Sequence, residues 1–294
     1  MTTPPAISVV IPTYGRPGAA ARLVSALATQ RLPPGGWVDV IVVDDGSPTP
    51  VEIAAEPPGT IRVRVLRQTQ QGPAAARNAG IAVAQGAMVA FVDDDCEPAP
   101  GWLSALLDAA HRYPECGLGG AVVNRLGDNP FAETSQLIVS FLCSYYADEH
   151  TGRFFTSNNL AFPTQTLLAV GGFDANYTRA AAEDRELCDR WVASGGRLVA
   201  VPGAVVLHAH NLTLRGFVRQ HFDYGRGALG YRRARASRAG APLRIEPWSF
   251  YRDLLRYPVR THGWRGSHLT VLVALAQAAN AVGFAVEAGR ARLA

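Results

Sequence analysis

The sequence predicts an α/β fold, a mostly parallel, doubly wound sheet flanked by helices, with a helical C-terminal extension. Strand-like apolar runs alternate with helical patterns four times within the first hundred residues, as in βαβ units. The first run, residues 7–12, is β-branched and apolar on both faces, as a buried parallel strand is. Further runs at 38–43 and 87–92 lead directly into aspartates. Ligands bind at such strand ends in open α/β sheets.

The same patterns predict the remaining elements. Pro17 opens a helix, because proline is favoured at a first helical position. Residues 124–155 carry mixed signals and are expected to form loops and a helix. The other expected elements are helices at 17–31, 73–85, 100–112, 163–170 and 183–194, and strands at 61–66, 117–123 and 197–207.

Composition narrows the class of protein. The 48% apolar and 18% charged residues are typical of a globular protein with a sizeable core. All 28 Lys+Arg residues are arginines, the net charge is +4, and no basic run suggests an RNA or DNA reader, so no nucleic acid is expected. The four cysteines are scattered without a C-x-x-C pair, and the first residues lack the features of a signal peptide. We therefore expect a cytoplasmic protein without a disulfide framework or zinc site.

Three consecutive aspartates, Asp93, Asp94 and Asp95, follow the strand at 87–92. One carboxylate could cap the next helix, but a cap does not need three. Oxygen ligands suit Mg²⁺ or Mn²⁺, which keep waters and substrate phosphates in their shell. A general acid/base pair is a third interpretation. Because side chains alternate along a strand, Asp93 and Asp95 are expected on the same side.

The other strand ends bear on nucleotide binding. The chain lacks G-x-x-x-x-G-K-[ST] and has no G-x-G-x-x-G after its first strand, which argues against a P-loop NTPase and a dinucleotide dehydrogenase. An aromatic beside a base, with a carboxylate that accepts from a pyrimidine N–H, would make a nucleoside pocket without a glycine loop. For residues 44–47 (DDGS), a plain Asp-Gly turn is an equally good interpretation.

Two histidines, His208 and His210, follow the apolar strand at 197–207. A lone histidine is more often a packed or surface residue than a ligand. Two histidines at alternate positions, in a chain that also has a D-x-D pair, favour metal binding. Both interpretations stand on these residues alone.

Eight motifs resemble, in order and spacing, those of a family 2 glycosyltransferase with the GT-A fold. They are ISVVIPTYGRP (7–17), VDDGS (43–47), QGPAAARNAGIAVAQG (71–86), FVDDDC (91–96), NNLAF (158–162), GGFD (171–174), EDRELCDRW (183–191) and VVLHAH (205–210). The resemblance covers roughly residues 6–211. Gly15, where the family usually has Asn, and the stiffer Gly72-Pro73 loop depart from the pattern without touching the implied chemistry.

The resemblance implies a nucleotide site at the first strand ends. Pro12, Tyr14 and Asp45 resemble the base-binding wall, with Asp44 beside them. Arg77 matches the family's arginine at the nucleotide.

It also implies a metal site and an acceptor side. Asp95 resembles the direct ligand of Mn²⁺ or Mg²⁺ in the D-x-D pair, with Asp93 as its partner nearer the ribose and Asp94 between them. The histidine that completes the metal–diphosphate site is His208 or His210. Asp184 resembles the catalytic base, and the residues implied on the acceptor side are Glu183, Trp191 and Asn159.

Local physics gives Asp184 a second interpretation. GGFD ends one helix, and Glu183-Asp184 begin the next, where the helix dipole favours carboxylates, so capping alone would explain the pair. As a base, Asp184 would take the proton of the acceptor hydroxyl as that oxygen attacks the anomeric carbon. A single base predicts inversion, because retention by double displacement needs a second carboxylate as nucleophile.

The C-terminal quarter has a different texture. Seven arginines among Phe and Tyr at 215–238 predict a basic amphipathic helix on an anionic membrane, or a solvated helix whose arginines cover the catalytic domain. The apolar run 269–286, interrupted by Gln277 and Asn280, favours a packed or dimer-forming helix over a membrane span. Peripheral contact with the inner face of the cell membrane and a homodimer through these helices are therefore expectations.

The sequence thus predicts a metal-dependent, inverting glycosyltransferase. The donor would be a nucleotide diphosphate sugar, UDP-linked before GDP- or dTDP-linked, and the acceptor a hydroxyl on a glycan, a lipid-linked molecule or a small molecule. The pathways expected are bacterial cell-envelope glycan, glycolipid or natural-product biosynthesis. Residues 1–212 would form the catalytic domain, with a nucleotide-binding half at 1–98 and an acceptor-binding half at 99–212, and residues 213–294 a helical region.

Two rival functions remain. A sugar nucleotidyltransferase would want a glycine-rich loop with arginine or lysine after the first strand, where this chain has only Gly15 and Arg16. A non-catalytic nucleotide- or carbohydrate-binding subunit would tolerate losing Asp93, Asp95 and Asp184, all of which are present.

Overall fold

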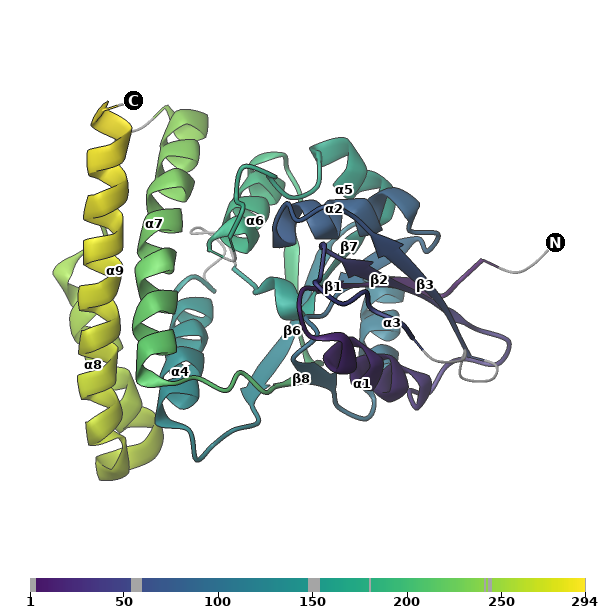
Figure 1. Cartoon of the computed structure of the whole chain (residues 1–294), viewed down its shortest axis with the longest axis horizontal. Helices are drawn as coiled ribbons and strands as arrows, with labels where there is room; N and C mark the ends of the chain where they lie inside the picture. The colour runs from purple at the N-terminus through teal and green to yellow at the C-terminus, as the bar shows by residue number, and fades with distance from the viewer. Residues whose placement is uncertain are drawn as a thin grey trace. The chain divides into compact units, whose positions relative to one another are not determined.

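The computed structural model describes residues 4–53, 60–147, 154–179, 181–240, 242 and 245–293 (Figure 1). The chain divides into two compact units. The α/β unit comprises residues 1–123, 155–178 and 190–209, and the helical unit comprises residues 124–154, 179–189 and 210–294. These limits differ from the expected division at residue 212, because 124–154 and 179–189 group with the C-terminal helices.

The α/β unit is built on a sheet whose described strands lie in the order β3-β2-β1-β4-β7-β6-β8-β5. β1 pairs in parallel with β2 and β4, and β2 pairs in parallel with β3. β7 runs antiparallel to β4 and β6. The strands are β1 (Ile7–Thr13), β2 (Val38–Asp44), β3 (Ile61–Arg67), β4 (Met88–Phe91), β5 (Cys96–Pro98), β6 (Gly117–Asn124), β7 (Leu160–Pro163) and β8 (Leu198–His208). The expected α/β class is confirmed.

Helices cover both faces of this sheet (Figure 1). On one face, α1 (Pro17–Ala28) and α3 (Trp102–Arg112) share a core with alternate residues of β1, Val9 and Ile11. On the other face, α2 (Pro73–Val83) approaches so closely that a β-carbon at Gly80 would overlap Val10. Because each face of β1 meets a helix, the strand is buried along its whole length. The 3-10 turn η1 (Ser157–Asn159), α5 (Thr164–Val170) and the C-terminal part of α6 (Glu183–Ala193) complete the unit.

The aspartates 93–95 lie in a turn, which corrects one expectation. β4 ends at Phe91, and the amide of Cys96 donates to the carbonyl of Asp93 at 3.0 Å. Strand alternation therefore does not orient Asp93 and Asp95. The chain then enters β5, a short strand that the sequence did not predict, which pairs antiparallel with β8 and sets Cys96 opposite His208.

The helical unit packs four long helices around an apolar core. They are α4 (Pro130–Tyr145), α7 (Leu214–Ala239), α8 (Trp248–His262) and α9 (Ser267–Leu293), with the 3-10 turn η2 (Gly263–Gly266) between the last two. Phe141 of α4 contacts the rings of Phe250 and Tyr257 of α8. This contact explains why α4 groups with the C-terminal helices. α8 was not predicted from the sequence.

The arginine-rich stretch at 215–238 is helix α7, and several of its arginines bind carboxylates of the helical unit. Arg226 lies 2.7 Å from Glu287 of α9, and Arg238 lies 2.6 Å from Asp189. The apolar run at 269–286 lies within α9, which buries Val273 in the core of this unit. In the described part of the chain, Trp248–Ala291 forms one helical stretch that is long and apolar enough to cross a membrane.

Candidate active site

The candidate site lies in the α/β unit, at the carboxyl ends of the parallel strands. Thr13 at the end of β1 pairs with Asp44 at the end of β2. The neighbouring strand β4 leads into the turn formed by Asp93, Asp94 and Asp95, called the acidic turn below. The sheet therefore brings residues from distant parts of the sequence to one edge, as expected of a doubly wound fold.

Asp93 is held by a buried arginine. Nη2 of Arg77, on α2, donates to Oδ1 of Asp93 at 2.7 Å, and the Arg77 side chain is 2% exposed. The guanidinium also lies over the ring of Phe173, 5.3 Å from its centroid. The structure thus brings the predicted nucleotide arginine into direct contact with the acidic turn.

The side chain of Asp94 is buried inside the protein. Its carboxylate accepts from Thr13 Oγ1 at 2.6 Å and pairs with Arg16 at 2.5 Å. Burial raises the pKa of Asp94 to about 6, although the charge of Arg16 and the hydrogen bond from Thr13 oppose the shift. The expectation that Asp94 contacts the nucleotide is corrected, because its side chain is fully buried and ties β1 to the acidic turn.

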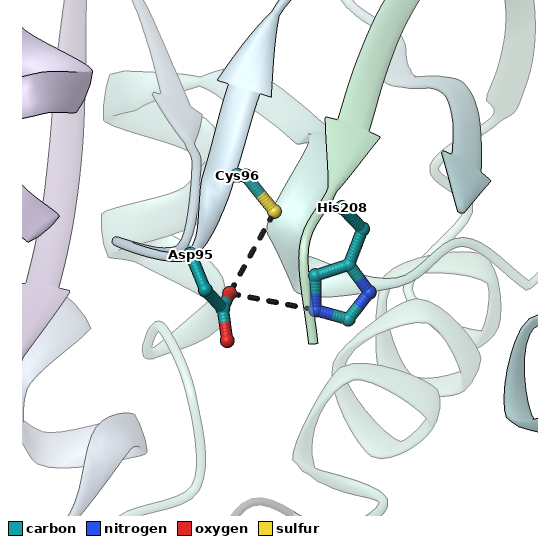
Figure 2. A group of neighbouring side chains, drawn as sticks. All are labelled: Asp95, Cys96 and His208. Carbon is teal, nitrogen blue, oxygen red and sulfur yellow. Dashed lines mark hydrogen bonds and ion pairs between the residues drawn. The ribbon is translucent and has the colours of Figure 1, made fainter. Parts of the chain in front are cut away.

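Asp95, the residue just before β5, lies beside His208 at the end of β8 (Figure 2). Nε2 of His208 lies 3.4 Å from Oδ1 of Asp95, and the thiol of Cys96 donates to the same oxygen at 3.9 Å. Burial alone would raise the pKa of Asp95, but His208 and Arg16 outweigh it and hold that pKa below its usual range. Conversely, burial would lower the pKa of His208, but the hydrogen bond and charge of Asp95 raise it.

This donor set fits a hard divalent cation. Among the residues that the structure describes, possible ligand atoms of Asp95, Cys96 and His208 lie within 4.8 Å of one another. A carboxylate oxygen and an imidazole nitrogen suit Mn²⁺ or Mg²⁺ with water and phosphate oxygens completing the shell. Cys96 fits less well, because burial and then the neighbouring aspartates raise the pKa of its thiol, and a metal binds the thiolate. His210 is not part of this group.

The two aspartates after β2 have separate roles. Asp44 is buried and accepts from the amide of Ser47 and from Arg67, at 2.8 and 2.6 Å. Burial would raise the pKa of Asp44, but these partners lower it. Asp44 therefore shapes its own turn, which corrects its assignment to the nucleotide.

Asp45 holds the loop between β3 and α2. Its carboxylate accepts from the Gln68 side chain at 2.7 Å and from the amides of Gln71 and Gly72 at 2.9 and 2.8 Å. Tyr14, by contrast, lies beyond β1 and is 46% exposed, so its ring is accessible to a base. Pro12 is buried within β1 and offers no wall to a ligand, which corrects that expectation.

A comparison with known protein families identifies the kind of protein that has this site. The sequence model described as "Glycosyl transferase family 2" matches residues 8–182, more than half of the chain. The chain belongs to glycosyl transferase family 2. The match includes the acidic turn, Arg77 and Asp45. It ends at residue 182, so Asp184 lies just outside it.

Relatives and solved structures agree with this family. The pre-mycofactocin glycosyltransferase of Mycobacterium tuberculosis (strain CDC 1551 / Oshkosh) is 33% identical over 228 residues, which are 76% of this chain and 46% of that protein. This chain thus spans about half the length of that curated relative. The mannosyltransferase PcManGT of Pyrobaculum calidifontis, solved with GDP-Man and Mn²⁺, matches with a TM-score of 0.55 at 20% identity, over 99% of this chain and 81% of that one.

Residues 1–349 of S. aureus TarS, solved with UDP-GlcNAc, match with a TM-score of 0.52 at 17% identity, over 97% of this chain and 91% of that one. Likeness at this level of identity shows the fold. The chain has the GT-A fold of a family 2 glycosyltransferase, a mixed, mostly parallel sheet flanked by helices and followed by a helical segment.

Two residues assigned to the acceptor are structural in this family member. Asn159 is 1% exposed, and its amide donates to the carbonyls of Ala121 and Ala204 while accepting from Trp102. Trp191 is 1% exposed and donates to the carbonyl of Arg197 at 2.9 Å. Both assignments are corrected, because neither side chain has a face open to an acceptor.

Asp184 and Glu183 open α6 within the helical unit. Oδ1 of Asp184 accepts from the amide of Arg185 at 2.7 Å, and Glu183 is buried. Ala182, just before them, has φ +70° and is the one non-glycine residue with positive φ in the described part of the chain. Backbone strain of this kind is concentrated at functional sites.

The sequence did not predict that Arg16 and Cys96 contact the acidic turn. Arg16 follows Gly15, whose φ of +69° turns the chain sharply after β1. The guanidinium then reaches both Asp94 and Asp95. An arginine next to a strand-end glycine was the available signal.

Proposed function

We propose that this chain transfers a sugar from a nucleoside diphosphate donor to a hydroxyl acceptor, with inversion at the anomeric carbon and with a divalent cation. The observation that carries this proposal is the meeting of Asp95 with His208 at the carboxyl edge of the sheet. The proposal rests on the GT-A fold and on family membership. It adds the substrates and the cation, which the family comparison does not identify.

The residues of the α/β unit have distinct tasks in this proposal. Tyr14 stacks on the base, and Asp45 binds it or shapes the loop beside it. Arg77, which the family resemblance assigns to the nucleotide, is buried against Asp93 and positions the acidic turn beside the donor. The donor is a UDP-sugar on this proposal, and GDP- and dTDP-sugars are the competing donors that the experiment below separates.

Asp95 and His208 would hold the cation. A divalent cation neutralises the charge that develops on the departing nucleoside diphosphate. The leaving group then needs no proton from the protein, so a single base is sufficient.

Asp184 is the proposed base, on the family resemblance and on the strained backbone at Ala182. Its carboxylate takes the proton of the acceptor hydroxyl while that oxygen forms the new bond to the anomeric carbon and the bond to the diphosphate breaks. A direct displacement of this kind inverts the anomeric centre, since no second carboxylate acts as nucleophile. The acceptor proposed is a hydroxyl on a bacterial glycan, glycolipid or small natural product.

The test is a thermal-shift screen of UDP, GDP and dTDP, each with Mn²⁺, Mg²⁺ or EDTA, followed by the sugar forms of the nucleotide that binds. A ligand that binds only the folded state raises the melting temperature. We expect one nucleotide to stabilise the protein with Mn²⁺ and not with EDTA, and Asp95→Ala to abolish this shift. Asp108→Asn on α3 is the matched control. Stabilisation that survives both EDTA and Asp95→Ala would remove the cation from the proposal, and no stabilisation by any nucleotide would remove the donor.

A further inference from the structure

The exposed side of α8 carries a regular row of tryptophan and arginine. Trp248, Arg252, Arg256 and Arg260 follow one another on α8 at intervals of four residues, and Trp264 lies in η2, just beyond Gly263, where α8 ends. Side chains four apart on a helix are neighbours. All five are exposed. We call this row the Trp–Arg ridge.

The two tryptophans of the ridge differ from the other three in the chain. Trp248 is 77% exposed and Trp264 is 88% exposed, whereas Trp37, Trp102 and Trp191 are buried. Folding does not explain why these two indoles are left in water, because nothing in the described chain covers them. Large exposed apolar groups beside charged ones mark an interaction surface.

An exposed apolar face of α9 follows the ridge along the chain. Its members recur at helical spacing and are Val271, Leu275, Val282 and Val286. The opposite face of α9 is in the core, where Val273 and Ala276 are fully buried. A β-carbon at Gly283 would overlap the carbonyl of Phe222 on α7. Because α9 is packed in this way, its apolar face fits the surface of a bilayer rather than a span across it.

The charges of α8 select the kind of partner. Asp253 is the acidic residue of this helix and already lies 3.1 Å from Arg252 and 4.0 Å from Arg260. The ridge therefore keeps a positive balance. Arg226 and Arg238 of α7, by contrast, bind carboxylates of the helical unit.

We propose that the Trp–Arg ridge and the exposed face of α9 form a surface that binds anionic lipid bilayers. Arginines attract the anionic headgroups, tryptophans settle at the boundary between headgroups and acyl chains, and the valines and leucine of α9 insert shallowly. This surface places the enzyme on a membrane and does not depend on the proposed transfer reaction. The sequence suggested membrane contact for residues 215–238 and for the apolar run 269–286, and this proposal adds the ridge on α8.

The tryptophans provide their own probe. The full chain is titrated with vesicles of phosphatidylcholine alone and of phosphatidylcholine containing one-third phosphatidylglycerol. We expect sedimentation with the anionic vesicles only, a blue shift of tryptophan emission, and quenching by phosphatidylcholine brominated on its acyl chains. Added salt should weaken the binding, because charge screening acts on exposed arginines.

Two sets of substitutions carry the same change in charge. The triple variant R252Q/R256Q/R260Q should weaken partition to the anionic vesicles by about 100-fold. The matched control R215Q/R219Q/R233Q alters three exposed arginines of α7 and should change partition little. The variant W248A/W264A should lose the blue shift and the quenching while its circular dichroism and melting temperature stay normal.

Three results would overturn the proposal. Equal loss of binding in both arginine triples would show a general charge effect. Absence of vesicle binding, with a dimer by light scattering that α9 substitutions dissociate, would assign the face to a second copy. Binding to a soluble polyanion such as heparin, without sedimentation by vesicles, would assign the ridge to an acidic polymer.

Discussion

The guanidinium of Arg16 lies 2.9 Å from Oδ2 of Asp95, the carboxylate proposed to hold the cation. The same guanidinium pairs with Asp94. A charged group of the protein itself therefore neutralises the acidic turn, and a divalent cation has to compete with Arg16 for Asp95.

Arg16→Gln should therefore strengthen Mn²⁺ binding. The Arg16 side chain is 51% exposed, and ion pairs of this exposure contribute less than about 1 kcal/mol, so we expect a gain of about two- to fivefold. Isothermal titration of Mn²⁺ in the presence of UDP measures it, with Arg22→Gln on α1 as the control for a lost surface charge. Weaker Mn²⁺ binding in Arg16→Gln would show that Arg16 supports the cation instead of competing with it.

Asp184→Asn should separate donor binding from transfer. The amide keeps the shape of the carboxylate but cannot accept the proton, so the transfer rate should fall by about 10²- to 10⁴-fold with the donor affinity unchanged. Asp189→Asn on the same helix is the contrast, because Asp189 binds Arg238 at 2.6 Å and its loss should lower stability rather than turnover. Near-normal turnover in Asp184→Asn would eliminate it as the base.

Asp45→Asn should loosen the loop between β3 and α2. The Asp45 carboxylate accepts three hydrogen bonds from residues 68–72, two of them from backbone amides. An asparagine amide group can replace at most part of this set, and its bonds lack charge assistance. Hydrogen exchange followed by mass spectrometry should show faster exchange in peptides that contain Gln71 and Gly72. Unchanged exchange there, together with weaker nucleotide binding, would assign Asp45 to the base alone.

The elements that sequence reasoning located well are those with one strong local signal. β1 and β2 are apolar runs that end in polar residues, and the structure places them within one residue of the expected limits. Helix α8 was missed, in physical terms, because Pro258 lies inside it and an internal proline usually argues against a helix. In the structure, α8 continues through Pro258, and the proline ring is buried in the helical unit.

The site was predicted in its residue types but not in their pairing. Motif order placed Asp95 and His208 in one site, yet the contact depends on β5, a three-residue strand with no period to detect. The errors at Asn159 and Trp191 have another cause. A motif shows which residue is present, whereas burial depends on packing with chain segments far away in the sequence, here Ala204 for Asn159.

Gly283→Ala should destabilise the helical unit. A β-carbon there would overlap the backbone carbonyl of Phe222, which cannot move as a side chain can, and overpacking of this kind costs about 1–3 kcal/mol or more. Gly289→Ala on the same helix is the matched control, since it has open space around it and should stabilise by up to about 1 kcal/mol. Urea unfolding measures both. Equal effects at the two positions would contradict the close approach of α7 and α9.

The stability of the helical unit should fall as pH drops from about 6.5 to about 4. His221 of α7 is 2% exposed, contacts Ser135 Oγ at 3.2 Å and packs against Phe217 and Tyr224. Burial lowers the pKa of His221 to about 4. Within this pH window the unfolded chain binds a proton at His221 that the folded chain excludes. The contribution of His221 to the free energy of unfolding is therefore greatest above pH 6.5 and decreases toward pH 4.

The loss attributable to His221 should reach about 3 kcal/mol at the low end of the window. Its measurement is the difference between the wild-type chain and His221→Phe in urea unfolding at several pH values, because the other titrating groups cancel. His111→Gln, at an exposed histidine of α3, is the control and should follow the wild type. If the His221→Phe chain loses stability with acid as steeply as the wild type, the buried imidazole is not the group that titrates.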